Sequence, residues 1–234
     1  MAKNDNIQDL LIDVANAIRA KKGSSAAINP QDFSSEITSI AGSSGTQRVT
    51  YLRRNGAGYI NTGINGANSN LKIVVRYALR AFPTGYWSLI HAYHNESSNA
   101  TRILMNKNTT ILGALNSIAS SSASMSRTGY TGIIYTDVLE PSGTSFKLSS
   151  NGTSTTKARS NGTALTNELT IFPKTEDAVD IELYELKIYN SSTLVRNYLP
   201  CIQNGEYGLW DTVTETFYGN EGTGAFEGET IIIN

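Results

Sequence analysis

The 234-residue chain contains a single cysteine, Cys201, and little charge. One cysteine excludes an intrachain disulfide and any metal site built from several cysteines. Charged residues make up 17% of the chain, below the roughly 25% that is typical of globular domains, so solubility has to come from Ser, Thr, Asn and Gly. The net charge is −1 and no basic block occurs, so we expect neither nucleic acid nor a membrane surface as a partner.

Long apolar runs are also missing. No stretch approaches the ~20 apolar residues that a transmembrane helix needs, so we expect no membrane span. The first residues lack a basic segment followed by an apolar run, so we expect no signal peptide. Together with the single cysteine, this favours maturation outside an oxidising secretory route.

Residues 5 to 41 read as helical. Ile7, Leu11, Val14 and Ile18 follow one another at spacings of four, three and four, which predicts one apolar helix face ending near residue 22. A second short helix is expected to begin with Asn29 as its N-cap and Pro30 at its first position. Phe33, Ile37 and Ile40 would form the apolar face of this second helix.

These two apolar faces have two interpretations. They pack against each other within the chain, or they dock on other copies or on a larger assembly. A helical hairpin of about 35 residues is too small to build a sufficient core alone, so we favour docking. The residues expected to make this contact are Ile7, Leu11, Val14, Ile18, Phe33 and Ile37.

Residues 46 to 234 read instead as short strands and turns, and the segment from Gly42 to Gly45 reads as a linker. Alternation from Leu71 to Arg80 places every second side chain on one face of a strand. The segment from Val179 to Tyr189 changes its apolar phase between 183 and 184, which predicts a β-bulge. Further strands are expected at 87–93, 101–105, 109–115, 132–139, 145–149 and 169–172. A serine-rich exposed loop is expected at 116–128. Turns are expected at the Asn-Gly pairs that begin at 55, 65, 151, 161 and 204. Many short strands punctuated by such turns predict an all-β sandwich or jelly roll. The expected domains are therefore 1–45 and 46–234.

Two segments carry a family resemblance. The first is Tyr51-Leu-Arg-Arg-Asn-Gly-Ala-Gly-Tyr-Ile-Asn-Thr-Gly63, and the second is the tail that begins at Leu194. They resemble the opening and closing segments of concanavalin A-like and laminin G-like jelly-roll domains over residues 49 to 228. In the tail the matching positions are Arg196, Pro200, Cys201, Gly208, Trp210, Asp211, Phe217, Gly222, Gly224 and Gly228. The resemblance implies a mainly β fold, a concanavalin A-like jelly-roll β-sandwich behind a short N-terminal α-helical module. It is much less specific for a function.

Residues 7 to 40 resemble a short helical module of tailed-phage structural proteins. The matching positions include Leu11, Val14, Ala15, Ala17, Ile18, Arg19, Lys22, Ile28, Pro30, Phe33, Glu36, Ile37 and Ile40. The resemblance implies a virion appendage that is assembled in the bacterial cytoplasm, with other capsid or tail proteins as partners. By analogy with phage fibres it implies a homo-oligomer, with a trimer preferred.

The acids Asp180, Glu182 and Glu185 are the sharpest catalytic candidates. A bulge at 183 and 184 would bring all three to one strand face, and retaining glycoside hydrolases on such sandwiches use two carboxylates about 5 Å apart. In those hydrolases the trio begins with Glu and has Asp in the middle, so the order here differs. A solvated outer strand face explains the acids more simply, because charged residues are usually exposed.

Aromatic side chains are the candidates for sugar binding. We expect Tyr86, Tyr93 and Tyr130 near turns or loops, where a ring can stack on a sugar, although edge aromatics that cap the sandwich are the alternative. Trp210 is expected in the core, with Asp211 holding a turn. Cys201, in the apolar context Leu-Pro-Cys-Ile, is expected to be a small buried residue.

We expect no metal site among the histidines and no cofactor. The sequence leaves open a calcium ion at the rim of the jelly roll, although no run of Asp and Asn at ligand spacing stands out. His91 and His94 would need to converge on a metal, but alternation along a strand points these two positions to opposite faces. Their spacing also fits no common zinc pattern.

The sequence therefore predicts a non-enzymatic bacteriophage structural protein, either a fibre or a decoration protein of head or tail. Residues 1–45 would attach or trimerise it, and the exposed jelly roll would be its candidate glycan-binding region. Two alternatives are a carbohydrate-active enzyme that uses the acids at 180–185 and a cellular surface lectin, which the missing signal peptide disfavours.

Overall fold

The computed structural model describes residues 7–22, 26–33, 45–81, 85–93, 95, 98–106, 110–126, 131–172 and 180–229. By its internal contacts the chain divides into two compact units. One comprises residues 1–47 with 203–205, and the other comprises residues 48–202 with 206–234.

The N-terminal unit contains helix α1 (Ile7–Lys22) and the 3₁₀ turn η1 (Pro30–Asp32). The first helix was expected, and it ends at Lys22. The second element is a single 3₁₀ turn within the described residues, with the Asn29 side chain accepting a hydrogen bond from the backbone N–H of Gln31 at 3.1 Å. This is the predicted N-cap. Among the residues that the structure describes, no helix is long and apolar enough to cross a bilayer.

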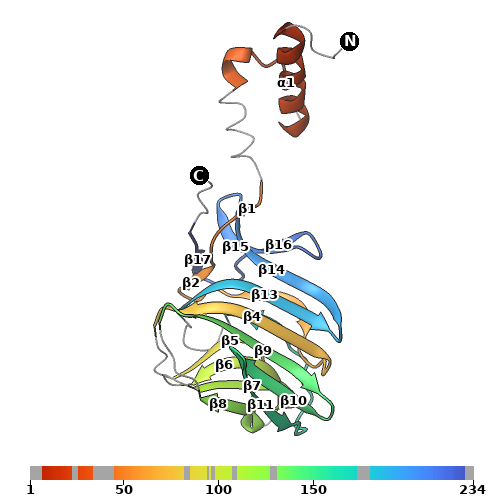
Figure 1. The fold of residues 1–234 in the computed structure, drawn as a ribbon, viewed down its shortest axis with the longest axis vertical. Helices are drawn as coiled ribbons and strands as arrows, with labels where there is room; N and C mark the ends of the chain where they lie inside the picture. The colour runs from red at the N-terminus through yellow and green to blue at the C-terminus, as the bar shows by residue number, and fades with distance from the viewer. Residues whose placement is uncertain are drawn as a thin grey trace. The chain divides into compact units, whose positions relative to one another are not determined.

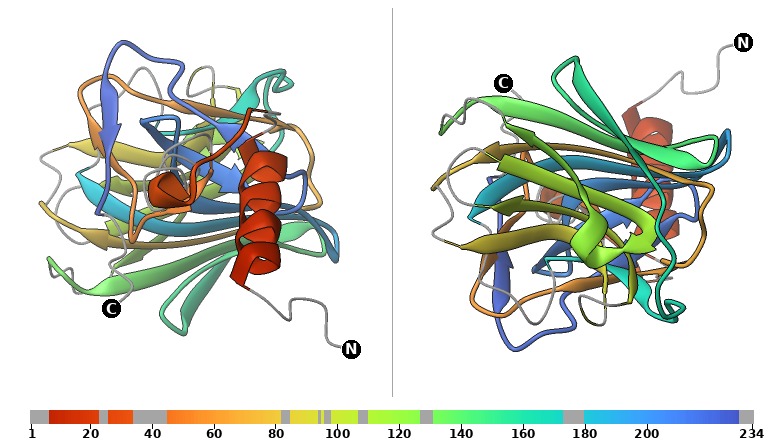
Figure 2. Two further views of the ribbon diagram at one scale, coloured as in Figure 1. Left: turned by 90° about the horizontal axis from the view of Figure 1, so that it is seen from above. Right: turned by 90° about the horizontal axis from the view of Figure 1, so that it is seen from below.

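The second unit is built from two large β-sheets and a short two-stranded one (Figure 1). Among the described residues, the large sheet has nine strands and the small sheet has six. In spatial order the large sheet contains β11 (Thr153–Ala158), β10 (Ser145–Ser150), β9 (Ile134–Ser142), β4 (Leu71–Leu79), β13 (Ile181–Asn190), β14 (Thr193–Gln203), β15 (Glu206–Asp211) and β16 (Thr216–Tyr218), with β1 (Gln47–Arg48) beside β14. The small sheet contains β3 (Ile60–Asn65), β12 (Glu168–Ile171), β5 (Tyr86–Ala92), β6 (Asn99–Asn106), β7 (Thr110–Ile118) and β8 (Ala123–Ser126). Figure 2 shows β5 to β8 in one layer and the long strands β4, β9 and β13 in the other.

The core lies between these layers. The expected face of β4 is confirmed, because Leu71, Ile73, Val75, Tyr77 and Leu79 are all at most 1% exposed. The predicted bulge in β13 is confirmed as well, since its register against β4 shifts between Leu183 and Glu185. Both features follow from period-2 alternation, which fixes the buried face of each strand.

Two Asn-Gly turns have the predicted backbone. Asn151 and Gly152 have φ values of 43° and 88° and join β10 to β11. Asn204 and Gly205 have φ values of 52° and 84° and join β14 to β15. Positive φ at both central residues is the type I′ requirement that Asn-Gly meets.

The prediction of an exposed loop at residues 116–128 was wrong for most of that segment. β7 continues to Ile118, the 3₁₀ turn η3 (Ala119–Ser121) follows, and β8 then pairs with β7. Ala119, Ala123 and Met125 are buried. Serine lowers apparent hydrophobicity, but the alternate apolar side chains of β8 still reach the core.

A short two-stranded sheet closes the sandwich. β2 (Arg53–Asn55) pairs with β17 (Ala225–Glu227), although the two strands are far apart in sequence. The Arg53 guanidinium binds Asp180 with Nε–Oδ1 at 2.7 Å and Nη2–Oδ2 at 3.2 Å, and its Nη1 binds Glu227 Oε1 at 2.9 Å. Gly224 packs so closely that a Cβ there would lie 2.4 Å from the backbone nitrogen of Ala57, so only glycine fits.

Candidate glycan-binding groove

The outer face of the large sheet carries a row of polar side chains that crosses four strands. Tyr189 on β13 lies opposite Lys72 on β4, and Glu140 on β9 lies opposite Lys147 on β10. Lys72 and Glu140 also meet, since Ile73 and Leu139, their neighbours in β4 and β9, are paired. Each of these side chains points outward because its neighbours Ile73, Leu139 and Leu148 point into the core.

Glu140 holds the centre of this row between two lysines. The Lys72 ammonium lies 3.0 Å from Glu140 Oε2, and the Lys147 ammonium lies 2.9 Å from Glu140 Oε1. The hydrogen bond from Lys147, followed by that from Lys72, lowers the pKa of the Glu140 carboxyl against the opposing effect of burial. Glu140 is therefore ionised at neutral pH, and the three groups together carry one positive charge.

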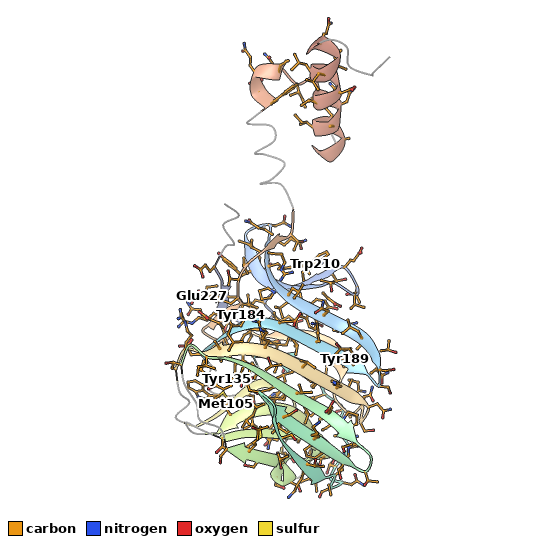
Figure 3. The ribbon with its side chains drawn as sticks, viewed as in Figure 1. Met105, Tyr135, Tyr184, Tyr189, Trp210 and Glu227 are labelled. Carbon is orange, nitrogen blue, oxygen red and sulfur yellow. The ribbon has the colours of Figure 1, made fainter. Side chains whose placement is uncertain are left out.

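Residues of this row line two cavities, which we together call the groove. The first, of about 560 Å³, is lined by Lys72, Glu140, Pro141, Tyr189, Ser191 and Ser192. The second, of about 300 Å³, is lined by Thr136, Val138, Lys147, Ser149, Asn151, Gly152 and Ser154. Glu140 lines the first cavity, and its ion-pair partner Lys147 lines the second. Figure 3 labels Tyr189, which lies on β13.

This arrangement suits a polyhydroxylated ligand. The half-buried ring of Tyr189 offers an apolar face, and the carboxylate, ammonium and hydroxyl groups offer both acceptors and donors. The volumes fall in or near the range of small-molecule pockets. A binding site with one aromatic surface beside convergent polar groups is the chemistry that recognises a sugar.

The three candidate catalytic acids are each held by a different cation. Asp180 binds Arg53, as described above. Glu182 is 9% exposed, lies 3.1 Å from Arg80 Nε, and accepts a hydrogen bond from the Tyr184 hydroxyl at 2.7 Å. Glu185 lies 2.8 Å from the Lys187 ammonium. None of the three lines either cavity of the groove.

Of the three predicted sugar-binding tyrosines, the structure describes the side chain of Tyr93, which lines neither cavity. Tyr86 is the first residue of β5, its side chain lies outside the described residues, and Tyr130 lies outside them entirely. Tyr93, just after β5, has the Arg102 guanidinium 5.1 Å from its ring centroid and the His91 ring 5.9 Å away. Burial and the Arg102 charge lower the pKa of His91 to about 4. The assignment of these tyrosines to a glycan stays a prediction.

Three other expectations concern Trp210, Asp211 and Cys201. Trp210 is half-buried on β15 and lies outside the main core cluster, so its core assignment was wrong (Figure 3). Asp211 holds the turn that follows β15, as expected, accepting hydrogen bonds from Val213 N and Thr214 Oγ1. Cys201 is fully buried, and burial raises the pKa of its thiol to about 12.

The predicted assembly residues lie mostly on α1. Ile18 is 4% exposed, Leu11, Val14 and Phe33 are half-buried, and Ile7 is the first residue of the helix. Ile37 lies outside the described residues. On the same helix Leu10 and Ile12 are 49% and 48% exposed. The role of these residues in assembly stays a prediction.

No metal-binding group is found in the described ranges of the chain, where no three His, Cys, Asp or Glu side chains gather suitably. His94 lies outside those ranges. Of the two histidines, the structure therefore describes His91. Its ring nitrogen Nδ1 lies 3.4 Å from Ser88 Oγ.

Sequence reasoning missed the groove. Alternation along β4 already places Lys72 on the outer face, and the same pattern exposes Glu140, Lys147 and Tyr189. To predict that these four side chains are neighbours, one needs the order and register of β13, β4, β9 and β10, which a single sequence does not supply.

No protein-family model and no curated protein matches this chain. Solved structures do match. A candidate carbohydrate-binding protein from Bacteroides ovatus ATCC 8483 has a TM-score of 0.54 and 11% identity, over 80% of this chain and 62% of that protein. The tailspike protein 2 from Escherichia coli O157:H7 bacteriophage CAB120 has a TM-score of 0.48 and 12% identity, over 64% of this chain and 25% of that one. Domains LG4-5 of the mouse laminin alpha1 chain have a TM-score of 0.44 and 10% identity, over 63% of this chain and 43% of theirs. At these identities the likeness shows the fold alone: the protein is a mainly β jelly-roll sandwich preceded by a short helical module.

Proposed function

We propose that this protein is a non-enzymatic glycan-binding protein whose jelly roll holds an oligosaccharide in the groove on its large sheet. The observation that carries the proposal is the row in which Tyr189 stands beside the Lys72–Glu140–Lys147 network, over a cavity of about 560 Å³. Tyr189 would stack on one sugar ring, and the ion network and neighbouring serines would bind its hydroxyl groups.

The carboxyl groups of the groove favour binding without hydrolysis. A glycosidase uses two carboxyl groups, one of them a general acid with a raised pKa. Among the described residues that line the groove, Glu140 is the single carboxyl group, and its lysine partners lower its pKa. Glu140 therefore lacks both the partner and the proton that the reaction needs.

We further propose that the protein is an appendage of a tailed-phage virion, in the class of fibre or decoration proteins. The support is the sequence resemblance of residues 7–40 to phage helical modules, followed by the jelly-roll motifs from residue 49 onward. In this arrangement residues 1–45 attach the protein or trimerise it, and the sandwich presents the groove. A host-surface or environmental glycan would be the ligand.

The test is a glycan array of bacterial-surface and plant oligosaccharides probed with the full chain, followed by calorimetry with the strongest binder. Tyr189→Ala should weaken that binding about tenfold, the upper range for one aromatic contact, and Tyr189→Phe should retain it. Tyr184→Ala is the matched control, because Tyr184 lies on the same strand but lines neither cavity. Binding that is lost equally in both alanine variants would contradict the site. An array without any bound glycan would contradict the function, and sugar release from the ligand would favour the enzyme alternative.

A further inference from the structure

The smaller cavity of the groove is cationic. Its lining contains one charged side chain, Lys147, among hydroxyl, amide and apolar groups, within the residues that the structure describes. The adjoining Glu140 is already shared between Lys147 and Lys72, at 2.9 and 3.0 Å. Two ammonium groups against one carboxylate leave a charge of +1 along this stretch of the sheet.

Lys147 has donors to spare. An ammonium group has three N–H donors, and a single one of them is used among the described residues, on Glu140 Oε1. Its side chain is 39% exposed. The side-chain oxygen of Asn151, by contrast, is already used, because Oδ1 accepts a hydrogen bond from the backbone N–H of Thr136 at 2.9 Å and so fixes the turn.

Two hydroxyl groups lie on the rows next to this ammonium. Ser149 on β10 and Ser154 on β11 are directly opposed in the sheet, and both line the smaller cavity with Lys147. Serine hydroxyls donate to an anion as readily as they accept from a sugar. The cavity thus combines one positive charge with neutral donors, a set that suits a monoanionic substituent better than a neutral hydroxyl.

The distance between the two ends indicates the ligand's length. Tyr189 and Lys147 lie on β13 and β10, three strand spacings apart in the order β13, β4, β9, β10. At about 4.8 Å per spacing this is roughly 14 Å. A ligand that reaches both ends must therefore be an oligosaccharide and not a single sugar.

We propose that the groove selects acidic oligosaccharides: the Lys147 end binds a monoanionic group on the sugar, a uronate carboxylate or a sulfate ester, while a neutral ring stacks on Tyr189. This inference rests on the proposed glycan-binding function and adds its ligand class. Because much of the attraction is between partly exposed charges, binding should weaken as salt rises from about 50 to about 300 mM.

The experiment compares ligands that differ only in charge. Oligogalacturonate is tested against its methyl ester, and sulfated galactan against unsulfated galactan, by calorimetry with the full chain. We expect the wild type to prefer at least one acidic form about tenfold. The pair that shows the preference identifies the group as carboxylate or sulfate.

Variants locate the contact. Lys147→Gln should remove the preference by weakening the acidic ligand alone, and Lys147→Arg, which keeps the charge, should retain it. The control is Lys157→Gln on β11, because Lys157 pairs with the core residue Phe146 and so lies on the opposite face of the sheet. Melting curves of all three variants show whether the fold is kept.

The outcomes separate this inference from the function on which it rests. Equal affinity for charged and uncharged forms, or equal effects of Lys147→Gln and Lys157→Gln, would overturn the acidic selectivity. Binding of neutral glycans alone that still depends on Tyr189 would overturn it too, while leaving the proposed function intact. Absence of binding to every glycan would overturn both.

Discussion

Replacing Asp211 by alanine should markedly destabilise the sandwich. This carboxylate is fully buried at the end of β15. Its Oδ1 accepts hydrogen bonds from the backbone of Asn197 at 2.8 Å and of Val213 at 3.1 Å, and its Oδ2 accepts one from Thr214 Oγ1 at 2.7 Å. Arg196 Nε lies 3.5 Å from the same Oδ2. The substitution removes the acceptor for all of these groups at once.

The size of the effect follows from these contacts. A hydrogen bond to a charged group contributes about 1.5–3 kcal/mol, and loss of one partner from a buried charged network destabilises by about 3–5 kcal/mol. Val213 is 43% exposed, so water replaces some of what is lost there. We therefore expect a loss of about 4 kcal/mol. For a domain of this size that corresponds to a melting temperature lower by roughly 8–16 °C.

Thermal unfolding followed by far-UV circular dichroism measures this change. Glu215→Gln is the control, because it alters charge in the same turn at an exposed side chain. Asp211→Asn should fall between the two, since its amide keeps one acceptor oxygen but presents N–H donors to the other contacts. A melting temperature for Asp211→Ala within about 2 °C of wild type would refute the reasoning.

Two further predictions concern pH and assembly. Burial, followed by the charge of Arg102, lowers the pKa of His91 in the folded chain from its ordinary 6.5 to about 4. Between pH 6.5 and pH 4 the unfolded chain therefore binds a proton at His91 that the folded chain does not bind. Stability should therefore be greatest above pH 6.5 and fall by about 3 kcal/mol toward pH 4, and His91→Gln should lack this component of the slope in denaturant titrations across that range. Residues 46–234 alone should fold as a cooperatively melting all-β monomer, whereas the full chain should be an oligomer by light scattering that Leu11→Asp with Val14→Asp dissociates. A monomeric full chain that docks on no virion component would contradict the assembly role.

Much of the fold could be predicted because some strands carry their own pattern. Every second residue of β4 from Leu71 to Leu79 is a large apolar residue, so its buried face was evident before its neighbours were known. The phase change at Leu183 likewise revealed the bulge in β13. The Asn-Gly pair at 151 identified its hairpin, since the turn depends on two residues and not on the rest of the fold.

The missed elements depend on tertiary context. β11, with the sequence Thr-Ser-Thr-Thr-Lys-Ala, is exposed along nearly its whole length and has no alternation to detect. It forms a strand because β10 offers it an edge. The groove was missed for a related reason: Lys72, Glu140, Lys147 and Tyr189 are spread over more than 100 residues and become neighbours through strand order alone.

The pairing of β2 with β17 also determines how late in translation the sandwich can be completed. The partners Arg53 and Glu227 are 174 residues apart. At about 5–20 residues per second, the ribosome needs roughly 10–35 s between them. Throughout that interval β2 has no strand to pair with, and its arginine lacks one of its carboxylates. The sandwich therefore seals only after translation has passed Glu227, and prematurely terminated chains are the species from which we expect aggregation.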